Sequence, residues 1–145
     1  LCPLSECIMA MSIDSDLTAY VPDILSLGIS VFTNEHARAQ GDIERRLRAD
    51  WWTKTGRSGE MDTTLLTESQ WTRCAAYRVL SAYALPQLST WRTDDRFTAM
   101  IGFYGSKYEE EFSDVLRDGV EYDADEDSSI AVSEKAPIHH GRLYR

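Results

Sequence analysis

Closely spaced carboxylates near the end of the chain have the residue types and spacing of a calcium loop. Side chains with oxygen atoms stand at loop positions 1, 3, 5, 7 and 12, which are Asp123, Asp125, Asp127, Ser129 and Glu134. Calcium takes six to eight hard oxygen ligands, and EF-hand loops supply them at these positions. Position 6, where glycine permits the sharp turn, is Ser128, and Gly119 and Pro137 interrupt the flanking helices. Calcium binding is therefore one interpretation, and a solvated acidic linker is the one that we favour.

The other candidate metal ligands form weaker patterns. Cys2 and Cys7 have C-x4-C spacing, but no second cysteine or histidine pair completes a zinc site. His139 and His140 are an isolated pair, which is usually incidental. With Cys74 the chain has three cysteines, which cannot all pair with one another. We therefore expect a reducing compartment, with neither a zinc site nor a disulfide framework.

Catalytic motifs are missing from the sequence. It contains no G-x-S-x-G, no glycine-rich phosphate loop and no H-E-x-x-H. Arg45, Arg46 and Arg48 could contact nucleic acid, but such a cluster is more often a solvated helix face with acidic partners nearby. The net charge of −9 also disfavours a general nucleic-acid binder. We expect no enzyme and, apart from the calcium alternative, no cofactor.

Three long segments with helical periodicity must position these residues. The first, 34–52, has an apolar stripe formed by His36, Ala39, Ile43, Leu47 and Trp51. The second, 68–85, has Trp71, Ala75, Val79, Ala82 and Leu85, and the third, 94–118, has Phe97, Ile101, Tyr104, Tyr108, Phe112 and Val115. Residues 17–27 add a short helical or turn-rich segment. The sequence thus predicts a mainly α fold, a small bundle of about four helices with an extended C-terminal tail.

Local signals suggest where these helices begin and end. Thr67 and Gln70 have the spacing of a capping box at the start of the second helix. Pro86 should end or kink that helix, because proline lacks the amide hydrogen and clashes with the preceding turn. Gly119 is well placed as the C-cap of the third helix.

The chain divides into one domain with two extensions. We expect a flexible leader at residues 1–14, the helical bundle at 15–118 and an extended acidic arm at 119–145, with a brief strand around residues 130–132. The longest apolar runs fall short of the roughly 18 residues that a membrane span needs. We therefore expect no membrane segment.

The residue patterns of several segments resemble those of head–tail connector (adaptor) proteins of tailed bacteriophages. The strongest part is residues 71–127, with WTRCAAYRVLSAYALPQLSTW, FYGSKYEEEF and GVEYDADED, and the likeness extends over YVPDILSLGI, IERRLRADWW and the terminal RLYR. Members of this group often carry a DxDGDG turn. The stretch Glu126, Asp127, Ser128 departs from it, which weakens the case for a metal.

The resemblance implies a structural virion protein that assembles as a ring, commonly a dodecamer, beneath the portal protein. Such a ring extends the DNA channel, lets DNA pass without sequence-specific binding, and docks the tail or a further neck protein. It also implies a place in the virion neck, reached from the host cytoplasm during assembly. The tail residues expected to contact the portal or a neighbouring subunit are Tyr122, Ile130, Val132, Leu143, Tyr144 and Arg145. The alternatives are another neck or head-completion component, and a calcium-responsive binding module that uses the acidic loop.

Overall fold

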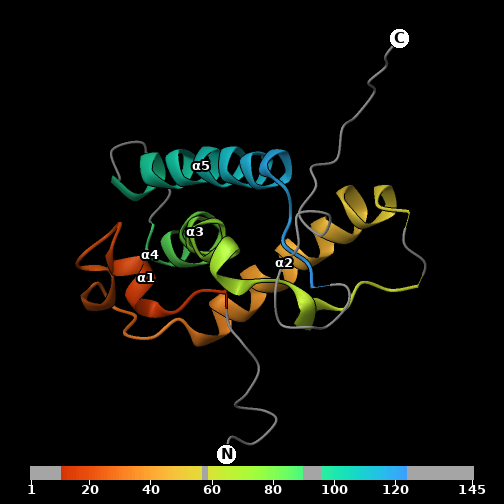
Figure 1. Cartoon of the computed structure of the whole chain (residues 1–145). Coiled ribbons are helices and arrows are strands. Elements are labelled where there is room, and N and C mark those ends of the chain that lie inside the picture. The colour runs from red at the N-terminus through yellow and green to blue at the C-terminus, as the bar shows by residue number, and fades with distance from the viewer. Residues whose placement is uncertain (1–10, 57–58, 90–95, 124–145) are drawn as a thin grey trace, which may run out of the picture.

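The computed structural model describes residues 11–56, 59–89 and 96–123, and they form a mainly helical protein (Figure 1). The helices are α1 (Asp14–Thr18), α2 (Thr33–Asp50), α3 (Glu68–Arg78), α4 (Leu85–Leu88) and α5 (Arg96–Asp118). Short 3-10 turns occur at Ile24–Ser26, Trp52–Lys54 and Thr63–Leu65, and a π-helical segment, Val79–Ala84, joins α3 to α4. The predicted mainly α fold of about four helices is confirmed, because α3, the π segment and α4 form one continuous rod.

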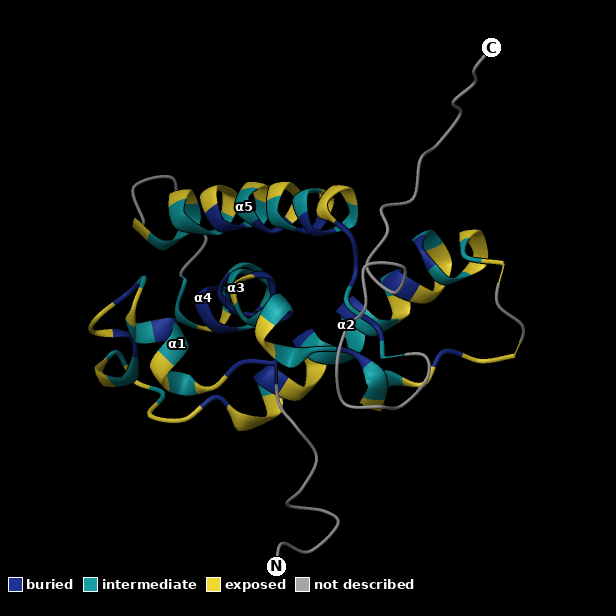
Figure 2. Cartoon of the chain, in the orientation of Figure 1, coloured by how far each residue is buried: buried dark blue, intermediate teal, exposed yellow. Residues whose placement is uncertain are grey.

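This rod is the centre of the bundle. It contacts α2 on one side and α5 on the other, and α1 packs near the start of α3 (Figure 1). Trp71 of α3 packs against Phe112 of α5 with ring centroids 5.5 Å apart and the rings tilted by 46°, in a core cluster that also includes Ile43 and Leu47. A second cluster surrounds Phe32 and Leu80 at the other end of the rod. Figure 2 shows the buried residues on the facing sides of these helices.

The predicted apolar stripes account for most of this core. All five residues of the first stripe are buried. In the second stripe Ala82 is half-buried and the others are buried, and in the third Phe97 and Ile101 are half-buried while the other four are buried. The three aromatic residues Tyr104, Tyr108 and Phe112 are therefore core residues.

Pro86 lies inside the central rod. The sequence predicted that this proline would end or kink the helix, and it does not end the helix. The turn before it is widened to a π helix, in which the Leu85 amide donates to the Leu80 carbonyl, five residues earlier. Proline has no amide hydrogen and its ring crowds the carbonyl four residues before it. The wider turn is a local distortion at this position, and the helix continues to Leu88.

The bundle includes residues on both sides of the predicted range 15–118. Met11 and Ser12, expected in a loose leader, are buried, and Asp14 already begins α1. Val120 and Tyr122, expected in an extended arm, are also buried.

Among the described residues there is no strand, and Leu66 and Tyr122 form one isolated antiparallel bridge. The expected strand at 130–132 lies outside the described residues. Every helix in the described part of the chain is too short or too polar to span a bilayer.

Candidate functional site

The chain leaving α5 folds back onto the start of α3, and we call residues 119–123 the C-terminal latch. Gly119 begins it with φ of 107°, a left-handed conformation that favours glycine, and its amide donates to the Val115 carbonyl over 3.0 Å. The predicted C-cap at Gly119 is confirmed. The reversal of direction allows the following residues to run antiparallel to the segment before α3.

Gln70 fastens the latch through both atoms of its side-chain amide. Its Nε2 donates to the Gly119 carbonyl over 2.8 Å, and its Oε1 accepts from the Glu121 amide over 2.9 Å. Gln70 therefore does not complete the capping box that its spacing predicted, and Thr67 makes no side-chain cap hydrogen bond. Two backbone hydrogen bonds extend the pairing: the Thr67 amide donates to Glu121 O over 3.3 Å and the Asp123 amide donates to Leu65 O over 3.0 Å.

Tyr122 inserts its ring into the core from the latch. The ring centroid lies 5.7 Å from that of Trp51 and 5.3 Å from that of Trp52, and the residue is only 4% exposed. Its phenol oxygen accepts a hydrogen bond from the Asp62 amide over 3.1 Å. Tyr122 was predicted to contact a partner protein, but its side chain is occupied within the bundle. The bundle therefore includes the latch, and contact of Tyr122 with a partner protein stays a prediction.

The other predicted tail residues lie outside the described residues. These are the contact candidates Ile130, Val132, Leu143, Tyr144 and Arg145, and the calcium candidates Asp125, Asp127, Ser129 and Glu134. Asp123, the first position of the calcium loop, is half-buried at the end of the latch. Within the part of the chain that the structure describes, no group of three or more His, Cys, Asp or Glu residues could hold a metal ion.

A polar cluster joins α2 to the other two long helices at one edge of the bundle. Asp42 accepts from Arg78 Nε over 2.9 Å and from the Tyr83 phenol. Burial, together with the hydrogen bond to Asp42, raises the pKa of Tyr83. Arg46 donates to Glu109 over 2.8 Å, and its guanidinium carbon lies 4.1 Å from the centre of the Phe112 ring. Charged groups here bridge the helices, and the aromatic face stabilises the half-buried cation.

The predicted basic cluster therefore separates into two kinds of residue. Arg46 is a bridging residue of the bundle, whereas Arg45 and Arg48 are exposed on the outer side of α2. Beside them is an open cavity of about 400 Å³. It is lined by Asp42, Arg45, Arg46, Ala49, Arg78, Tyr108 and Glu109. Its two carboxylates already pair with Arg78 and Arg46, so the cavity shows no unpaired acid or base poised for proton transfer.

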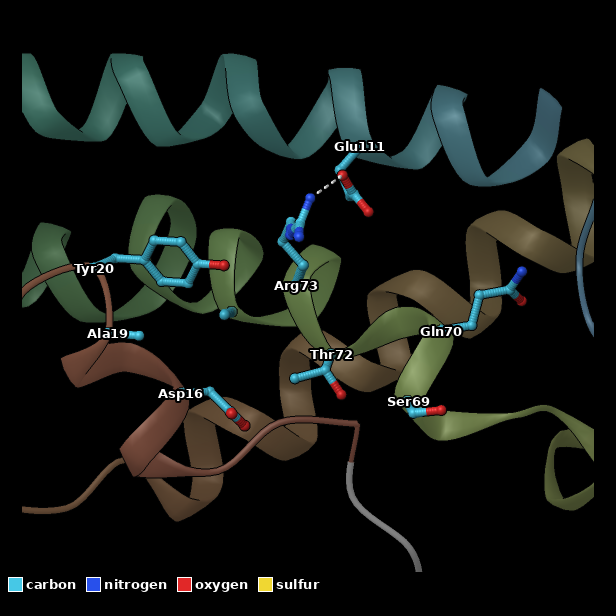
Figure 3. Close-up of a pocket in the computed structure, with 9 residues that line it drawn as sticks. Asp16, Ala19, Tyr20, Ser69, Gln70, Thr72, Arg73 and Glu111 are labelled. Atoms are coloured by element: carbon cyan, nitrogen blue, oxygen red, sulfur yellow. Dashed lines mark ion pairs between the residues drawn. The ribbon is translucent and has the colours of Figure 1, made fainter. Parts of the chain in front are cut away.

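A second open cavity, also of about 400 Å³, lies between α1, α3 and α5 (Figure 3). Asp16 and Tyr20 line one side and Thr72 lies on α3, where Arg73 points toward Glu111 of α5. The Arg73 Nη1 and Glu111 Oε1 atoms are 3.8 Å apart, and Arg73 is 63% exposed. Exposed pairs of this kind contribute roughly 0–1 kcal/mol. The lining thus resembles ordinary polar surface more than a formed ligand site.

A hydrogen-bond network that the sequence did not reveal involves Ser12, His36 and Asp14. Ser12 Oγ lies 2.7 Å from His36 Nδ1, and Asp14 Oδ1 lies 2.9 Å from His36 Nε2. A carboxylate can only accept, so His36 Nε2 donates to Asp14, and Nδ1 makes the second hydrogen bond with the Ser12 hydroxyl. These are the groups of a serine-hydrolase triad, but Ser12 is only 3% exposed and lines neither cavity described above. We interpret the network as the tie that holds residues 12–14 against α2.

Cys74 is fully buried in α3, and burial raises the pKa of its thiol. A buried, protonated thiol is a poor nucleophile and a poor metal ligand. Cys74 lies within the range 68–85 that was predicted to be helical, and it acts as a small apolar core side chain. Cys2, Cys7, His139 and His140 lie outside the described residues.

Comparison of the chain with protein-family models, with curated proteins and with solved structures found no match.

Proposed function

We propose that this chain is the subunit of a head–tail adaptor, a structural virion protein that forms a ring under the portal of a tailed phage. The ring would extend the DNA channel and dock the tail or the next neck protein. The proposal starts from the likeness of residues 71–127 to adaptor sequences. On this proposal the protein is made in the host cytoplasm, resides in the virion neck and acts by assembly alone.

The C-terminal latch is the structural observation that best supports this proposal. Residues 119–123 are fixed to the bundle by Gln70 and Tyr122, so whatever follows Asp123 leaves from a defined point on the surface. A fixed origin is what an arm needs to dock on the portal or on a neighbouring subunit.

The charge of the chain also agrees with a channel-forming role. At −9 the subunit repels DNA as a whole, and DNA in a channel must move without being held by phosphate contacts. A wall of like charge would let it slide. Basic side chains lining the bore of an assembled ring would contradict this part of the proposal.

Electron microscopy with mass determination tests the function directly. The purified protein is imaged alone and after mixing with a portal-containing capsid fraction. Rings, or a collar at the portal vertex, are the expected result. A monomer that does not bind the portal vertex would rule the proposal out.

Two measurements separate the alternatives. Another neck component, such as a stopper or tail-completion protein, would bind an adaptor-loaded vertex and leave a bare portal unoccupied. A calcium-responsive module would release or take up heat when titrated with calcium. Absence of heat at millimolar calcium would leave the acidic stretch as a linker.

A further inference from the structure

The outer side of α2 carries three exposed arginines, Arg38, Arg45 and Arg48, which we call the arginine face. Their spacing of seven and three residues places them on one side of the helix. Arg45 is 80% exposed, and its nearest acidic atom, Asp42 Oδ1, is 4.0 Å away. Arg38 and Arg48 make no ion pair with any described residue. The arginine face is therefore a basic surface on a strongly acidic protein.

The outer side of α5 carries the opposite charge. Glu110, Asp114 and Asp118 recur every four residues, are 64%, 40% and 67% exposed, and form what we call the acidic face. Their ion-pair partners are Lys107 and Arg117 of the same helix, at 3.0 to 3.6 Å. Exposed pairs of this kind contribute only roughly 0.2–1 kcal/mol. These carboxylates can exchange a local partner for one on another molecule at little cost.

The two faces lie on two different outer helices of the bundle. The rod of α3, the π segment and α4 lies between α2 and α5, and each outer helix turns its buried stripe toward that rod (Figure 2). The exposed residues of α5 lie on the side away from α3. Each outer helix also has one large exposed apolar residue near its face, Val31 just before α2 and Phe103 two turns before Glu110, both 56% exposed.

We infer that the arginine face of one copy docks on the acidic face of the next copy. Contact between two different faces of identical chains is heterologous, and it closes into a ring when the rotation per subunit permits. Copies with a charge of −9 repel one another in general, so opposite charges at the contact set both affinity and orientation. This inference rests on the proposed ring and identifies the two surfaces that would form it.

Duplex DNA is the other polyanion that an arginine face could bind. The second copy is favoured because the complementary surface is present on the same molecule, on another helix. An arginine face turned toward the bore would also hold DNA by its phosphates. The experiment below therefore also measures DNA binding.

Charge reversal on each face, followed by restoration, tests the inference. One variant carries Arg45→Glu and Arg48→Glu, a second carries Glu110→Lys and Asp114→Lys, and a third combines all four substitutions. All four side chains are exposed or half-exposed, so circular dichroism should show an unchanged fold. Lys54→Glu with Arg96→Glu is the matched control, because it makes the same charge change as the first variant at exposed positions that belong to neither face.

Mass photometry then measures the protein concentration at which half of the chains are assembled. The first and second variants should each raise this concentration roughly tenfold or more, since favourable pairs become like-charge pairs. The fourfold variant should regain assembly, and the control should assemble like the original chain. Assembly of the original chain should also weaken between about 0.1 and 1 M salt.

Three outcomes would overturn the inference. Rings that persist in both single-face variants would leave the adaptor proposal intact but place the subunit contact elsewhere. Rings that persist while Arg45→Glu and Arg48→Glu abolish DNA binding would assign the arginine face to DNA. An original chain that stays monomeric both alone and with the capsid fraction would remove the adaptor proposal and this inference together.

Discussion

Replacing Tyr122 with alanine separates its role in the core from its predicted role as a contact residue. The ring packs on Trp51 and Trp52, and the phenol oxygen accepts from the Asp62 amide. Truncating a buried aromatic residue to alanine costs roughly 3–5 kcal/mol. Because Tyr122 lies at the margin of its core cluster and keeps 4% exposure, we expect a loss near the lower end, about 3 kcal/mol.

Urea denaturation followed by circular dichroism at 222 nm measures this loss. With a slope of about 2 kcal/mol per molar urea, a loss of about 3 kcal/mol lowers the midpoint by roughly 1.5 M. Tyr122→Phe keeps the ring and loses one hydrogen bond, so its midpoint should fall by only about 0.5 M. Phe103→Ala is the matched control, because this aromatic residue is 56% exposed and its loss should change stability by no more than about 0.5 kcal/mol.

The reverse pattern would refute the reasoning. If Tyr122→Ala unfolds at the same urea concentration as the original chain but fails to bind the capsid fraction, the side chain is a contact residue and the latch is not part of the core. A midpoint shift equal to that of Phe103→Ala would lead to the same conclusion.

Three further predictions follow from single residues of the bundle. With the other two cysteines replaced by serine, Cys74 should resist Ellman's reagent at pH 8 and react fully in denaturant, because its thiol is buried and its pKa is raised; rapid labelling of the native protein would contradict this. Burial raises the pKa of Tyr77 to about 12 from 10, so the phenol of the native protein resists deprotonation. Its contribution to the free energy of unfolding is complete below pH 10 and is lost as the pH rises to 12. Tyrosinate absorbance at 295 nm and urea midpoints measured across this pH range check the prediction. Gly119→Ala should destabilise by roughly 1–2 kcal/mol because of its positive φ, whereas Gly102→Ala, with open space around a helical position, should stabilise by up to about 1 kcal/mol; equal urea midpoints for the two variants would refute the contrast.

The helical core could be predicted from the sequence because its signal is local. Apolar residues that recur every three or four positions fall on one side of a helix, and that side is buried whatever it packs against. For His36, periodicity predicts the burial of the side chain but not its hydrogen-bond partners. Its place on the stripe indicated burial, but its partners Ser12 and Asp14 are more than 20 residues away and no spacing rule connects them.

The latch could not be predicted because its contacts are long-range. Thr67 and Gln70 satisfy the spacing of a capping box, yet Gln70 bonds residues 49 and 51 positions farther along the chain. Composition was misleading in the same region. The acidic run that begins at Glu121 suggested an exposed arm, while Val120 and Tyr122, at alternate positions among those polar residues, are the side chains that the bundle buries.

Truncation on either side of the latch tests how anchoring and docking divide along the chain. A chain ending at residue 123 keeps the latch, the arginine face and the acidic face, so it should fold with an unchanged urea midpoint and form rings, but fail to collar the portal vertex. A chain ending at residue 118 also loses both Gln70 hydrogen bonds and the Tyr122 ring, and should unfold at least as easily as Tyr122→Ala. Rings and a portal collar from the chain ending at 123 would show that residues 124–145 are not needed for docking. The fixed exit point would then lose its functional meaning, and the outer faces of α2 and α5 would have to bind the portal as well as the neighbouring copy.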